Sequence, residues 1–110
     1  MGAPLNVFKT ITANVTTTAN TIYTAPTGYT TVVLLAQVSN IGANTITVSS
    51  NHIRGGIPTA LVKGASVPTN DAISLLTGKL VLNTTDAINV LASSNDVSQI
   101  LLSILETANP

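Results

Sequence analysis

The sequence predicts an all-β protein: a single antiparallel β-sandwich or jelly-roll-like domain of about eight strands. Apolar residues make up 45% of the 110 residues, which is enough for one core in one domain. Short runs rich in Val, Ile, Leu and Thr are cut by Pro, Gly, Asn and Asp at the spacing of a sandwich. Helical patterns do not alternate with these runs, as they would around a parallel sheet.

The N-terminal segment, residues 1–19, is interpreted as either a first strand or an extended arm, and residues 20–110 as the sandwich domain. Residues 6–17 alternate with a period of two, with Ile11 on one side and Phe8 on the other. This pattern fits a strand of the sheet and an arm lying on a neighbouring subunit equally well.

The strongest predicted strand is residues 30–39, which is apolar on both sides in its middle. One side carries Val32, Leu34, Ala36 and Val38, and the other carries Val33 and Leu35. A strand with two apolar sides is normally covered on both. Because a two-layer sandwich covers only one side, the second cover is expected to be a partner chain.

The remaining strands follow from alternation between turn residues. We expect them at residues 20–25, 45–50, 59–63, 72–76, 79–83, 87–93 and 97–107. The last run also fits a helix, because Ile100, Leu101, Ile104 and Leu105 would form a helical stripe. A strand is favoured there because its neighbours are strands.

The low charge points to assembly. Four Lys and Arg and four Asp and Glu cannot make the mixed charged surface of a typical small domain. Either partners cover much of the surface, which we favour, or Thr and Asn hydrate it. The predicted interface residues are Val33, Leu35, Phe8 and Ile11. The expected partners are further copies of the chain, as a trimer or less favourably a dimer.

No residue pattern predicts catalysis, a cofactor or a metal. The chain has no cysteine, and its single histidine, His52, has no acid near it in sequence. Three of the four acids, among them Asp86, fall in predicted turns, where Asp bonds its own backbone. The irregular loop at residues 51–58 is the candidate recognition loop, carried by His52, Arg54 and Ile57. Scattered basic residues and the lack of a long apolar run predict neither nucleic acid nor membrane as a partner.

Several segments resemble small β-sandwich virion proteins of tailed phages. The first is the turn Thr21–Thr30, with the letters TIYTAPTGYT, which leads into a Val/Leu-rich strand. The later matching segments are residues 61–63, 67–68, 74–75, 78–82, 86–90 and 100–106. The resemblance covers about residues 20–107. It implies a virion structural protein without catalytic residues: a capsid decoration (cement) protein that binds the major capsid protein or another virion protein. The alternative is a tail, baseplate or fibre module.

Overall fold

The computed structural model describes residues 6–109, which form two antiparallel sheets and no helix. The strands are β1 (Asn6–Val15), β2 (Asn20–Thr24), β3 (Tyr29–Asn40), β4 (Ile46–Arg54), β5 (Ile57–Val67), β6 (Ala72–Ser74), β7 (Leu80–Leu82), β8 (Ala87–Ala92) and β9 (Ser98–Ala108). The predicted all-β sandwich is therefore confirmed.

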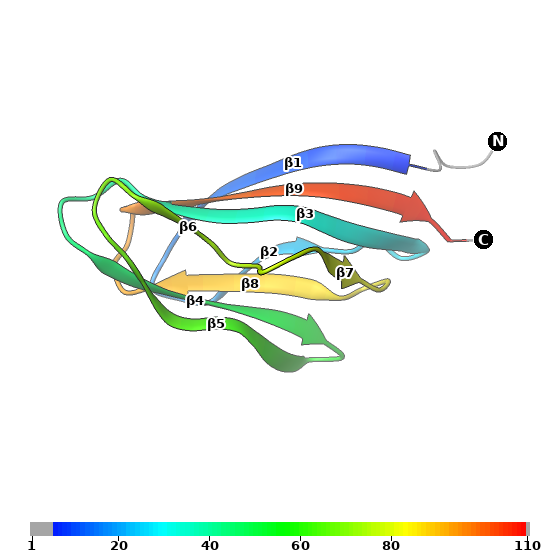
Figure 1. Ribbon diagram of the computed structural model, residues 1–110. Helices are drawn as coiled ribbons and strands as arrows, with labels where there is room; N and C mark the ends of the chain where they lie inside the picture. Colours follow the sequence, from blue (N-terminus) through cyan, green and yellow to red (C-terminus); the bar gives the residue numbers. More distant parts are fainter. Residues whose placement is uncertain (1–5, 110) are drawn as a thin grey trace.

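The two sheets face each other along an elongated molecule of 50 × 25 × 22 Å (Figure 1). Sheet A has the order β1-β9-β3-β6, and β7 pairs with β3 beyond the end of β6. Sheet B has the order β2-β8-β4-β5. The start of β1 and the end of β9 lie at the same end of the sandwich, together with the β4–β5 and β7–β8 turns.

Both ambiguous terminal segments are strands. β1 pairs with β9 without interruption from Asn6–Thr107 to Val15–Ser98, so residues 6–15 are part of the sheet and not an arm. β9 pairs on its other side with β3, and the helical alternative for residues 97–107 was wrong. Residues 1–5, the rest of the predicted arm, lie outside the described residues.

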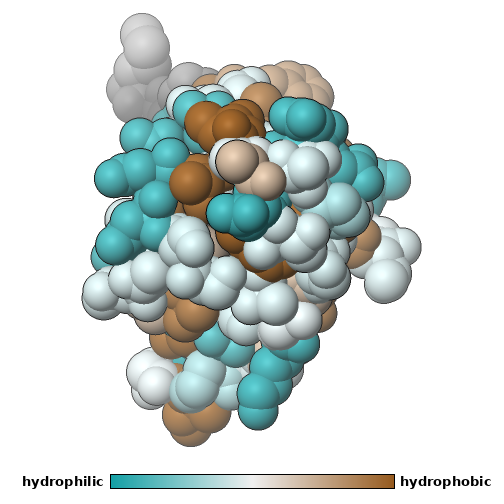
Figure 2. All heavy atoms as spheres, turned by 90° about the vertical axis from the view of Figure 1, so that its left-hand side faces the viewer, coloured by the Kyte–Doolittle hydropathy of each residue, from teal (hydrophilic) through white to brown (hydrophobic). Residues whose placement is uncertain are grey.

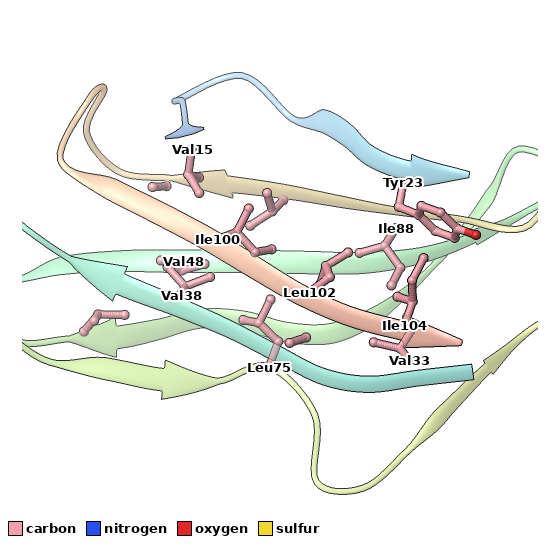
Figure 3. Packing of buried hydrophobic residues seen from close by; sticks show 14 of the residues in the cluster. Val15, Tyr23, Val33, Val38, Val48, Leu75, Ile88, Ile100, Leu102 and Ile104 are labelled. Carbon is pink, nitrogen blue, oxygen red and sulfur yellow. The ribbon is translucent and has the colours of Figure 1, made fainter. Parts of the chain in front are cut away.

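The core lies between the sheets and is made almost entirely of aliphatic side chains (Figure 3). Leu102 and Ile100 of β9 point from sheet A toward Val48 and Ile88 of sheet B, and all four are at most 1% exposed. Inward residues alternate with outward ones along β8 and β9, as a half-buried strand requires.

A bulge in β3 changes which of its residues face the core. The register with β9 shifts between Val33 and Leu35, so Leu34 is the extra residue. Val33 and Ala36 are buried, whereas Leu34 and Leu35 are 39% and 40% exposed. The expectation that Val33 and Leu35 share one side was wrong, because strict alternation fails at the bulge.

The turn after β3 contains a glycine without space for a side chain. A Cβ on Gly42 would lie 2.8 Å from the Cβ of Val97, and the Gly42 N–H donates to Asn40 Oδ1. Gly42→Ala should therefore lower the free energy of unfolding by about 1–3 kcal/mol through overpacking. Urea unfolding measures this. The matched control is Gly78→Ala, whose Cβ meets no atom within 4 Å, and equal effects would contradict the prediction.

Candidate interaction surface

The segment predicted as a recognition loop is a tight hairpin. β4 runs to Arg54 and β5 begins at Ile57, so only Gly55 and Gly56 form the turn. Both have positive φ, 58° and 78°, as a two-residue type I′ hairpin turn requires. The loop prediction for residues 51–58 was wrong: His52 and Arg54 belong to β4, and Ile57 begins β5.

The hairpin is anchored by a buried carboxylate, and we name His52, Arg54 and Asp86 the Asp86 cluster. Asp86 is 3% exposed. Its Oδ2 accepts from Arg54 Nη2 at 2.7 Å and lies 3.0 Å from His52 Nε2. Arg54 Nε also donates to the carboxylate, as does the backbone N–H of Asn83. These contacts, the Arg54 hydrogen bond foremost, outweigh burial and lower the pKa of Asp86 to about 2.

Sequence reasoning missed the Asp86 cluster because its members are 32 to 34 residues apart. β4 pairs with β8 so that His52 lies opposite Ile88, two residues beyond Asp86. Asp86 does stand beside a turn, as predicted, since its N–H donates to the Asn83 carbonyl. Only the pairing of β4 with β8 shows that its carboxylate faces two basic side chains.

A second buried carboxylate, Glu106, links the two sheets. On sheet A, its Oε1 lies 2.9 Å from Lys9 Nζ. From sheet B, the Tyr23 hydroxyl donates to its Oε2 and lies 2.8 Å from Thr31 Oγ1. Burial alone would raise the pKa of Glu106, but the hydrogen bonds from Tyr23 and Lys9 hold it below its usual value. Burial and Glu106 together raise the pKa of Tyr23.

Both carboxylates therefore serve as hydrogen-bond acceptors within the fold. The oxygens of Asp86 and Glu106 are occupied by donors of this chain, which leaves neither placed as a free general base. Within residues 6–109, three or more His, Cys, Asp or Glu side chains nowhere gather as a metal site would require. That part of the chain also holds no helix long and apolar enough to cross a membrane.

The outer face of sheet A carries four apolar side chains in one row, which we name the apolar row. Strand register places Phe8 opposite Leu105, Leu105 opposite Val32, and Val32 opposite Val81. Directly opposed residues of antiparallel strands share a face, so the row crosses β1, β9, β3 and β7. Phe8 is 73% and Val81 51% exposed. The β3 bulge places Leu34 and Leu35 beside the row.

The predicted interface residues thus separate into two groups. Phe8 and Leu35 lie exposed on the outer side of sheet A. Ile11 lies opposite Leu102 and packs partly buried against the core, and Val33 is fully buried in it. At the hairpin, Ile57 is 70% exposed, whereas His52 is largely buried against Asp86.

The opposite end of the sandwich has a different surface. Figure 2 shows the end that carries the β3–β4, β5–β6 and β8–β9 turns. Much of it is pale, the colour of residues with intermediate hydropathy such as Thr and Ser, and hydrophobic atoms appear in separate spots. An uncharged polar surface of this kind is the alternative to partner coverage that the composition left open.

Comparisons with known proteins support the fold of this chain and assign it to no family. No protein-family model and no curated protein matches the sequence. A chain from the Bacillus endospore appendages, which form a family of disulfide-linked pili, is 16% identical with a TM-score of 0.58, and the match covers 99% of this chain and 93% of that one. A chain from the acidic stable capsid structure of Helicobacter pylori bacteriophage KHP30 is 7% identical with a TM-score of 0.56, covering 97% and 90%. This chain shares its fold over almost its whole length with a pilus-forming and a phage capsid protein.

Proposed function

We propose that this chain is a structural protein of a phage virion, a capsid decoration (cement) protein that binds the assembled shell and stabilises it. The apolar row is the observation that carries the proposal. It places an exposed Phe, an exposed Val and two partly exposed neighbours on one face of sheet A, with Leu34 and Leu35 beside them. Contiguous exposed apolar side chains of this kind mark an interaction surface.

The other properties of the chain support the same role. Its surface carries little charge, since only eight residues of the chain are charged at neutral pH, four of each sign. The segments that resemble phage virion proteins and the fold shared with the KHP30 capsid chain add support. On this proposal the chain lies on the capsid surface, and its partners are the major capsid protein and further copies of itself.

The proposed mechanism is mechanical. Apolar surface buried on binding contributes about 25 cal/mol per Å². A protein that binds the assembled shell, and not its separated subunits, stabilises the shell by mass action. The Glu106 contacts link the two sheets, and the Asp86 cluster anchors the β4–β5 hairpin.

Shells that carry this protein should open at a higher temperature than shells without it. Purified shells with and without added protein are heated, and release of the enclosed nucleic acid is followed with a dye. Val81→Lys should lose the protection because it places a charge in the apolar row, whereas Thr47→Lys, exposed on the outer face of sheet B, should keep it. Equal heat resistance of decorated and bare shells would refute the proposal.

A tail, baseplate or fibre module is the second candidate, and the β4–β5 hairpin favours it. The hairpin presents Ile57, 70% exposed, beside a turn of two glycines that the Asp86 cluster holds in place. The fold shared with the pilus-forming chain also fits a filament, although without cysteines this chain cannot be disulfide-linked. Copy number separates the candidates: hundreds of copies per virion indicate the capsid, and three to a few dozen the tail.

A further inference from the structure

Three of the four edges of the two sheets are protected against pairing with another strand. β6 and β7, at one edge of sheet A, have only three residues each. β2 has five residues and a register shift. β5 is long, but it contains Pro58, an exposed Lys63 and Gly64, and its register with β4 shifts twice. Short strands, prolines, lysines and bulges are the usual devices that block edge pairing.

The fourth edge, β1, has only one of these devices, a lysine. It runs for ten residues without proline or glycine, and its register with β9 is continuous. Its single charged residue, Lys9, lies on the inward face and is neutralised by Glu106 at 2.9 Å. β9 is the only described strand that pairs with β1, so a full row of backbone N–H and C=O groups faces outward.

We propose that the free edge of β1 pairs antiparallel with β1 of a second copy, around a two-fold axis perpendicular to sheet A. The pairing joins two five-stranded sheets into one continuous sheet. The inference goes beyond the proposed capsid role and does not rest on it.

Three properties favour a second copy of the chain as the partner that pairs with β1. β1 is itself a long edge strand with a continuous register, so each copy supplies the complement that the other lacks. The chain has a formal net charge of zero, so two copies approach without net repulsion. The two-fold axis also places the outer faces of both sheets on the same side, so the two apolar rows lie on one face of the joined sheet.

An isologous contact of this kind closes at two copies. The proposal therefore replaces the trimer that the sequence favoured with a dimer. It also accounts for the position of Phe8, whose side chain is 73% exposed on an edge strand in the isolated chain. In the dimer this ring packs against outward residues of the partner β1.

A cysteine scan along β1 tests the pairing directly, because the natural chain has no cysteine. Residues 8–14 are replaced by cysteine one at a time and the purified proteins are oxidised. In a two-fold antiparallel pair one position faces its own copy, and a disulfide needs Cα atoms about 4.4–6.8 Å apart. We expect one maximum of cross-linked dimer within β1 and little with Thr47→Cys. Equal yields along β1, or a larger yield at Thr47, would overturn the proposal.

Sedimentation equilibrium of the cysteine-free protein provides the second measurement. We expect a monomer–dimer equilibrium. Thr10→Lys should weaken it at least about tenfold, because it places an outward-facing charge on both of the paired strands. Thr47→Lys is the matched control, and thermal unfolding verifies that both variants fold. A monomer at all concentrations, a trimer, or equal weakening by both variants contradicts β1 pairing. None of these results bears on shell binding, which the heating experiment measures separately.

Discussion

Replacing Asp86 with asparagine should lower the free energy of unfolding at pH 7 by about 2–3 kcal/mol. Asparagine keeps the size of the side chain but removes the negative charge of the carboxylate. That carboxylate accepts hydrogen bonds from Arg54 and lies beside His52. Hydrogen bonds to a charged group contribute about 1.5–3 kcal/mol each, and screening at the half-exposed Arg54 reduces that amount. Urea unfolding of the two proteins measures the difference.

The same variant should remove much of the acid sensitivity of the fold. The pKa of Asp86 is about 2 in the folded protein, whereas an unfolded Asp titrates near about 3.9. A lowered folded pKa contributes stability that is fully present above the unfolded pKa. That stability is lost as the pH falls from about 4 through about 2. Glu106, whose pKa is also lowered, should retain the rest of the slope in the variant.

Asp96→Asn is the matched control for both measurements. Asp96 is exposed and has a φ of 61°, a conformation that asparagine adopts readily. The free energy of unfolding of the Asp96→Asn variant at pH 7 should equal that of the natural protein, and so should its change between pH 4 and pH 2. An Asp86→Asn variant with the natural slope in that range would show that the carboxylate does not hold the hairpin by its charge.

The strand pattern was predictable wherever alternation and turn residues agree. Residues 87–93 and 97–107 were expected as strands and nearly coincide with β8 and β9, because inward Ile, Val and Leu recur at every second position there. The β4–β5 hairpin was not predicted, because Gly55, Gly56 and Pro58 together are typical of a loop. Pro58 is tolerated since β5 is an edge strand, where one side needs no N–H donor.

The candidate surface was only half predictable, because it depends on which strands are neighbours. Phe8 and Leu35 were expected at an interface and lie exposed, but the apolar row needs β7 beside β3 and β1 beside β9. Asp86 and His52 come together only through the pairing of β4 with β8. No local pattern in the sequence predicts such pairings, and none predicts the bulge at Leu34.

Opposite effects of one substitution at two positions of β3 should show where its register changes. Val33→Asp should leave the protein largely unfolded, because Val33 is fully buried between the sheets and has no described charged partner. An unpaired buried carboxylate costs several kcal/mol, and a domain has only about 5–15 kcal/mol of stability. Leu35→Asp should remain folded and lose about 1 kcal/mol, since Leu35 is 40% exposed and Asp suits a strand poorly.

Circular dichroism and urea unfolding measure both variants, and Leu34→Asp is the control that identifies the bulge. With strict alternation, residues 33 and 35 would share a face, so their variants would unfold together while Leu34→Asp behaved differently. With the bulge at Leu34, the variants at 34 and 35 should both fold and only the one at 33 should fail. Folded Leu35→Asp should also bind shells more weakly than the natural protein, because it places a charge beside the apolar row. A stable Val33→Asp would place that side chain outside the core and contradict the register on which the apolar row depends.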